Sequence, residues 1–60
     1  MTGREVIRLL EENGWLLDRI RGSHHTMIKD GKTLSVPVHG GKDLGKGLLS
    51  KLLKEGGVKK

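Results

Sequence analysis

The sequence predicts a small α+β fold in the order helix, three antiparallel strands, helix (α-β-β-β-α). Apolar residues recur at helical spacing near both ends of the chain. Two short extended runs between them flank the dipeptide Asp30-Gly31, which is typical of hairpin turns. Two amphipathic helices can cover one face of such a sheet and leave its other face open to a ligand. A chain of 60 residues supports one core, so we expect a single domain over residues 1–60.

The first predicted helix spans about residues 3–13. Thr2 and Glu5 have the spacing of a capping box, in which each side chain accepts a hydrogen bond from the backbone N–H of the other residue. Asn13-Gly14 supplies the left-handed stop with which helices commonly end. The apolar stripe that would face the sheet consists of Val6, Ile7, Leu9 and Leu10.

The segment at about residues 15–21 is too short for a second helix and has the period of two that is typical of a strand. Alternation places Trp15 and Leu17 on one face together with Arg19, so the two faces of this strand are not cleanly divided into polar and apolar. Trp15 is the only aromatic residue of the chain, and we expect it in the core.

Two further strands are expected at about residues 24–29 and 32–38, joined by the Asp30-Gly31 hairpin. Pro37 lacks a backbone donor, so it belongs at an edge or an end of the later strand, where pairing should stop. The face of that strand directed to the core would carry Leu34, Val36 and Val38.

The last helix is predicted over about residues 44–55, with Asp43 as its N-terminal cap. Gly45 and Gly47 weaken its first turn by roughly 1 kcal/mol each, and Gly56-Gly57 ends it. The leucines that recur at helical spacing are Leu44, Leu48, Leu49, Leu52 and Leu53. This helix would complete the cover on one face of the sheet.

The chain carries a net charge of +5, so its electrostatic field attracts polyanions. RNA is the partner class that we favour, although an acidic protein would satisfy the same field. The absence of cysteine excludes a disulfide framework and a cysteine-based zinc site. Neither a signal peptide nor a stretch of about 20 apolar residues is visible, so we expect a cytoplasmic protein with no membrane partner.

Three sequence features, in a fixed order, resemble the HicA family. They are Glu12-Asn13-Gly14-Trp15 at the end of the first helix, Arg21-Gly22-Ser23-His24-His25 at the start of the second strand, and Val36-Pro37-Val38-His39 with Lys42-Asp43-Leu44 before the last helix. Together they cover nearly the whole chain. The resemblance implies a fold similar to a double-stranded-RNA-binding domain. It also implies a ribonuclease toxin of a type II toxin–antitoxin pair, which cleaves messenger RNA and is neutralised by a HicB-type antitoxin.

The two adjacent histidines are the candidate catalytic residues. An imidazole gives or takes a proton near neutral pH, so it can act as general base on a ribose 2′-hydroxyl or as general acid on the leaving oxygen, with no metal or other cofactor. Neighbours on a strand point to opposite faces, so only one of the two lines the open face. The family motif most often places its functional histidine directly after Gly-Ser, which favours His24 over His25.

Five further residues are candidates for contacts to RNA. Gly22 would let the backbone approach RNA closely or adopt a positive φ, and Ser23 would donate to a phosphate, but a plain turn explains both residues equally well. His39 follows Val-Pro-Val, as in the family, although an ordinary loop histidine also fits. Lys29 and Lys42 would contact phosphates, which gives affinity without reading sequence.

Two alternatives stay open at the level of sequence. The fold and the charge also suit a non-catalytic double-stranded-RNA-binding module, which cleavage of RNA in the presence of a chelator would exclude. The other alternative is a metal site made by His24 or His25 with His39. It lacks a cysteine or a well-spaced carboxylate to complete a tetrahedral set, so we expect no metal.

Overall fold

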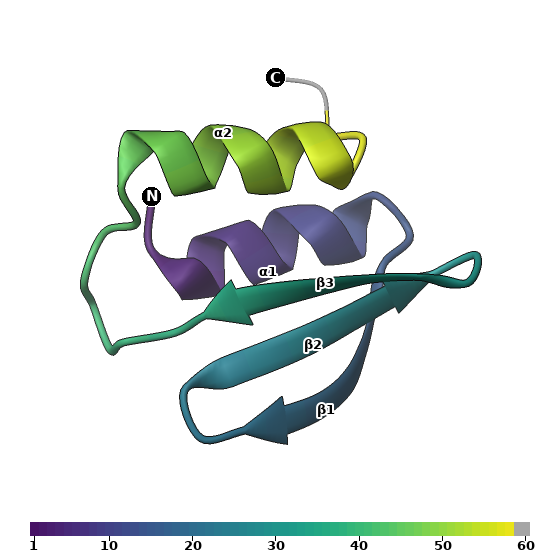
Figure 1. The fold of residues 1–60 in the computed structure, drawn as a ribbon, viewed down its shortest axis with the longest axis horizontal. Coiled ribbons are helices and arrows are strands. Elements are labelled where there is room, and N and C mark those ends of the chain that lie inside the picture. Colours follow the sequence, from purple (N-terminus) through teal and green to yellow (C-terminus); the bar gives the residue numbers. More distant parts are fainter. Residues whose placement is uncertain (59–60) are drawn as a thin grey trace.

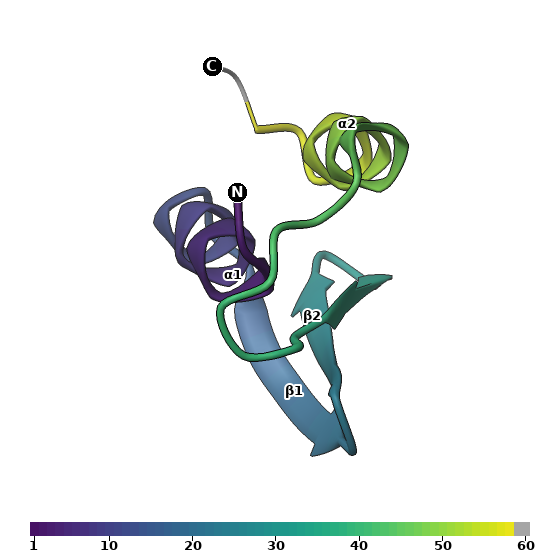
Figure 2. The same cartoon turned by 90° about the vertical axis from the view of Figure 1, so that its left-hand side faces the viewer.

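The computed structural model describes residues 1–58, in which two helices pack on one face of a three-stranded antiparallel sheet (Figures 1 and 2). The predicted order α-β-β-β-α is confirmed. The elements are α1 (Gly3–Glu12), β1 (Leu16–Arg21), β2 (His24–Lys29), β3 (Lys32–Pro37) and α2 (Lys46–Glu55). Because β2 lies in the middle of the sheet, β1 and β3 form its two edges. Neither helix has the length and apolar character needed to cross a membrane.

Helix α1 begins with the predicted capping box. The Thr2 N–H donates to Glu5 Oε1 at 2.8 Å, and the Glu5 N–H donates to Thr2 Oγ1 at 3.2 Å. The hydrogen bond from the Thr2 backbone lowers the pKa of the Glu5 carboxyl below its ordinary value. At the other end, Gly14 has a φ of 94°, and the Trp15 N–H then donates to Leu10 O at 2.9 Å. Local hydrogen bonds therefore close the helix at both ends.

The ladder between β1 and β2 contains a β-bulge that alternation did not predict. Leu17 is paired with Met27, but the next pair is Arg19 with Thr26, so Asp18 is an extra residue without a partner in the ladder. The extra residue turns Arg19 to the face opposite Leu17. The expectation that Arg19 shares a face with Leu17 is therefore wrong, and Arg19 lies on the face that the helices leave open.

The hairpin between β2 and β3 is formed as predicted. Asp30 and Gly31 have φ values of 49° and 79°, the left-handed conformation that a two-residue turn of this kind requires. The two strands pair without interruption from Lys29 with Lys32 to His24 with Pro37. The strand ends at Pro37, which cannot donate to a further pair.

Helix α2 begins at Lys46, two residues after the predicted start at residue 44, and Asp43 does not cap it. The residue at the cap position is Gly45, and no side chain caps this end. Asp43 is instead paired with Thr2 in an isolated β-bridge, and the Leu44 N–H donates to Met1 O at 2.8 Å. This pairing holds residues 43 and 44 in an extended conformation, which displaces the start of the helix.

The core lies between the two helices and the sheet. Trp15 is 2% exposed, and its Nε1–H donates to the Gly56 carbonyl at 2.9 Å, which joins the end of α2 to the chain entering β1. A Cβ at Gly56 would lie 2.5 Å from Leu10 Cδ2, so glycine permits this close approach. The cluster of buried residues consists of Val6, Leu10, Trp15, Met27, Leu34, Val36 and Leu52.

Candidate functional site on the open face of the sheet

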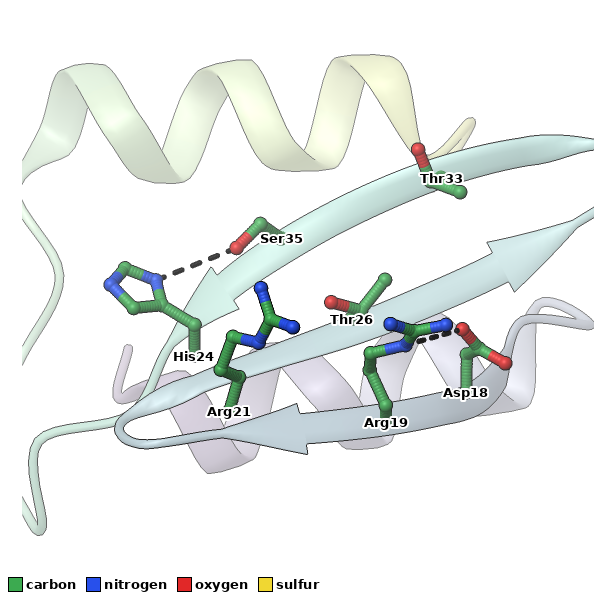
Figure 3. A pocket seen from close by; sticks show the side chains of 7 residues that line it. All are labelled: Asp18, Arg19, Arg21, His24, Thr26, Thr33 and Ser35. Atoms are coloured by element: carbon green, nitrogen blue, oxygen red, sulfur yellow. Dashed lines mark hydrogen bonds and ion pairs between the residues drawn. The ribbon is translucent and has the colours of Figure 1, made fainter.

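The sheet face opposite the helices carries a shallow hollow lined almost entirely by polar side chains (Figure 3). All three strands contribute to it. The lining residues are Asp18, Arg19, Arg21, His24, Thr26, Thr33 and Ser35. Two guanidinium groups against one carboxylate make the hollow positive, so it suits an anionic ligand.

His24 stands at one end of this hollow, as the first residue of β2. The turn before it contains Gly22, whose φ of 60° is left-handed. His24 is paired with Arg21 across the ladder, which places their Cβ atoms about 4.5–5.5 Å apart. The Ser35 hydroxyl lies 3.5 Å from His24 Nδ1 (Figure 3). A long hydrogen bond at this nitrogen orients the ring and leaves Nε2 for a ligand, so the exposed imidazole is suited to proton transfer.

His25 points to the opposite face, as the alternation of a strand requires. Its neighbours in the ladder are Ile20 and Val36, and its side chain is half-buried on the face that the helices cover. The Nδ1 atom is buried and has no hydrogen-bond partner. His25 therefore does not reach a ligand bound in the hollow.

Arg19 and Arg21 are the two cationic lining residues that were not predicted from the sequence, and Ser35 was not predicted either. The expected phosphate contacts were Ser23 and lysines, and strict alternation placed Arg19 on the covered face. The bulge at Asp18 brings both arginines to the hollow, and Asp18 Oδ2 accepts a hydrogen bond from Arg19 Nε at 3.3 Å (Figure 3). Among residues 1–58, Arg21 forms no ion pair. The available signal was the run Arg19-Ile20-Arg21, in which the period of two places both arginines on one face and Ile20 on the other.

Gly22, Ser23 and His39 lie near the His24 end of the hollow without lining it. Gly22 and Ser23 form the turn between β1 and β2. The Val38 N–H donates to Ser23 O at 2.6 Å, so the segment that leads to His39 runs beside this turn. No Cβ contact within 4 Å would constrain Gly22, whose left-handed φ is sufficient reason for glycine.

Lys29 and Lys42 are not brought to the hollow. Lys29 Nζ donates to Asn13 O at 2.7 Å on the covered side, where it holds the C-terminal end of α1. Lys42 is exposed in the loop before α2, and its N–H donates to His39 O at 3.1 Å. Within residues 1–58, no three His, Asp or Glu side chains gather in a way that could hold a metal ion.

Comparison with known families adds a finding that is independent of this geometry. A family model described as the HicA toxin of bacterial toxin-antitoxin matches residues 3–58. A search of curated proteins gave no match. The matched range includes both helices, the whole sheet and every residue that lines the hollow.

Proposed function

Because this chain belongs to the HicA toxin family of bacterial toxin–antitoxin systems, we propose that it is a ribonuclease toxin that cleaves messenger RNA with His24 as a proton-transfer residue. One observation carries the choice of residue. His24 lies on the open face, opposite Arg21 and beside the Ser35 hydroxyl, whereas His25 faces the core.

The reaction that fits this face is attack of a ribose 2′-oxygen on the adjacent phosphorus. The O2′–P bond forms while the P–O5′ bond breaks, so one proton leaves the 2′-hydroxyl and one is delivered to the departing 5′-oxygen. His24 performs one of these transfers, as base or as acid, and water carries the other proton. The products are a 2′,3′-cyclic phosphate and a free 5′-hydroxyl.

The two arginines supply the electrostatic part of this mechanism. Negative charge grows on the non-bridging phosphate oxygens as the phosphorus gains its fifth oxygen. Guanidinium groups donate two parallel hydrogen bonds to such oxygens and stay charged at any physiological pH. Arg21, which faces His24, is placed to bind the reacting phosphate, and Arg19 is placed to bind it or its neighbour. Ser35 is a positioning residue, because it acts through the His24 ring.

We also propose that the chain acts in the cytoplasm without a metal ion or other cofactor, and that a HicB-type antitoxin neutralises it. The family match supports an antitoxin partner in general terms. The positive open face favours a partner that presents acidic groups. An antitoxin seated over His24 and the arginines would block RNA binding and proton transfer together.

A non-catalytic double-stranded-RNA-binding module is the second candidate, and the fold and the charge favour it. Incubation of the purified protein with end-labelled messenger RNA in EDTA separates the two. We expect fragments that end in a 2′,3′-cyclic phosphate. Binding without fragments would leave the binding module, and cleavage that EDTA abolishes and a divalent ion restores would contradict the metal-independent mechanism.

A further inference from the structure

The open face continues past the polar hollow into an apolar patch formed by Leu16 and Ile28. These two residues are paired across β1 and β2. Ile28 lies on the same face as His24, because it follows that residue by four positions in a regular strand. A second hollow lies over this pair, and its lining residues are Gly14, Leu16, Ile28, Lys29, Asp30 and Gly31.

Leu16 is more exposed than Ile20 and Leu17, the other exposed apolar residues of the sheet, and its partner Ile28 is half-buried. Met27 and Val36 are fully buried under the helices, whereas Leu16 is 67% exposed, more than any other large apolar side chain in residues 1–58. Leu16 belongs neither to the core cluster nor to the apolar residues packed against it. Leu16 and Ile28 therefore offer an apolar contact on the same sheet face as the positive hollow, beside the charged side chains of Lys29 and Asp30.

The distance between the two hollows matches a short stretch of nucleic acid. The pair Arg21–His24 and the pair Leu16–Ile28 are four residues apart along β2, which is about 13 Å at the rise of a strand. A stacked nucleic-acid strand covers this distance in about four nucleotides, and an extended strand covers it in fewer. One RNA strand can therefore occupy both hollows at once.

We propose that Leu16 and Ile28 form a subsite for an unpaired nucleobase of the same RNA strand whose phosphate is bound at Arg21 and His24. Bases pack against aromatic or apolar side chains through their flat faces. In a duplex those faces are covered by the neighbouring base pairs, so the subsite requires RNA that is single-stranded at this position. The inference rests on the proposed ribonuclease function and names its substrate as single-stranded RNA.

Chemically defined RNA tests the subsite. The substrate is a nonamer in which only the central nucleotide has a free 2′-hydroxyl, the others being 2′-O-methylated, so that cleavage is confined to one linkage. Leu16→Thr and Ile28→Thr should each lower kcat/KM on the nonamer about fivefold, mainly through KM, as expected for loss of one weak base contact. A dinucleotide, which is too short to reach the subsite, gives the reference rate for each variant.

Abasic nucleotides locate the contact. At one position of the nonamer, removal of the base should reproduce the effect of Leu16→Thr, and the variant should add no further loss on that substrate. Leu48→Thr, which removes a leucine exposed on α2, is the matched control and should leave kcat/KM on both substrates unchanged. Annealing a complementary strand to the nonamer should remove the dependence on Leu16.

The subsite would be overturned by additive effects of Leu16→Thr and of every abasic position, by an equal effect of Leu16→Thr on the dinucleotide, or by cleavage of the duplex at the single-strand rate.

Binding of the labelled nonamer to His24→Ala, with and without Leu16→Thr, tests the subsite without cleavage, and Leu16→Thr should weaken this binding. If the parent protein cleaves no RNA but its binding of the nonamer is weakened by Leu16→Thr, the ribonuclease function is refuted and the subsite is retained. Weaker antitoxin binding by Leu16→Thr with unchanged RNA affinity would assign the patch to the antitoxin and refute the subsite.

Discussion

The two faces of the sheet are made by alternate residues of the same strands, but one face is largely apolar and buried and the other is largely polar and open. On the covered face, Met27 and Val36 are fully buried against the helices. On the open face, Thr26 and Ser35 line a positive hollow that all three strands share. Because the helices cover only one face, residues that alternate along one strand either pack into the core or stay available to a ligand.

The strongest test of this division uses the two adjacent histidines. His24→Ala should lower the RNA cleavage rate by about 10² to 10⁴, because it removes a proton-transfer group, while changing stability by no more than about 0.5 kcal/mol. His25→Ala should keep the parental cleavage rate, because its side chain faces the core. Single-turnover cleavage and urea denaturation of both variants provide the measurements.

The opposite pattern would contradict the assignment of catalysis to the open face. If His25→Ala lost cleavage while His24→Ala retained it, the covered face would hold the catalytic group and the open face would only bind RNA. If both single variants and the double variant cleaved at the parental rate, neither histidine would transfer a proton in the rate-limiting step.

A second pair of neighbours tests the same division through stability. Met27→Ala should cost about 2–5 kcal/mol, since it leaves a cavity in the core. A loss of that size is comparable with the whole stability of so small a domain, about 3–5 kcal/mol, so this variant should be largely unfolded. Thr26→Ala, one residue away on the open face, should cost about 1 kcal/mol or less. Circular dichroism with urea titration compares them, and equal losses would contradict the division.

Most of the helices, strands and turns could be predicted from the sequence. The capping box at Thr2, the Asp30-Gly31 turn and the period of two in β3 each depend on a few adjacent residues, so local rules sufficed. The start of α2 could not be predicted in this way. Asp43 has the chemistry of a cap, but its pairing with Thr2 joins segments far apart in the chain.

The open face was predicted less completely than the covered face. The opposite directions of His24 and His25 follow from strand geometry alone. Arg19 was misplaced because a bulge depends on how two strands pair, which the period of a single strand does not reveal. Lys29 has the charge of a phosphate contact, yet the backbone carbonyl of Asn13 binds its ammonium group. Positive charge indicated the class of ligand, and only the pairing of the strands located the residues.

The dependence of RNA affinity on salt concentration tests whether the phosphate contacts lie on the open face. RNA affinity should fall steeply with added salt, because arginine contacts to phosphates release counterions. Arg21→Ala should weaken binding to RNAs of different sequence alike and reduce the slope of log K against log salt by about 1. Lys51→Ala is the control. Lys51 is exposed on α2, on the helical side of the molecule and away from the open face of the sheet, so its removal should leave the slope unchanged. Fluorescence anisotropy at several salt concentrations measures both slopes, and equal reductions would show that the phosphate contacts are not confined to the hollow.

The smallest expected effect concerns the first turn of α1. The hydrogen bond from the Thr2 backbone lowers the pKa of Glu5 in the folded protein, so the ionised carboxylate stabilises the folded state. Because the folded pKa lies below the unfolded one, this stabilisation is present above the unfolded value, about 4.3, and is lost as the pH falls through the lowered folded value. Glu5→Gln keeps an oxygen acceptor but has no charge, so its deficit relative to the parent should appear near neutral pH and vanish in acid. Urea denaturation of both proteins at about pH 7 and at a series of pH values below about 4.3 measures the difference. A deficit that persists in acid would mean that the shape of the side chain, and not its ionisation, stabilises the first turn of α1.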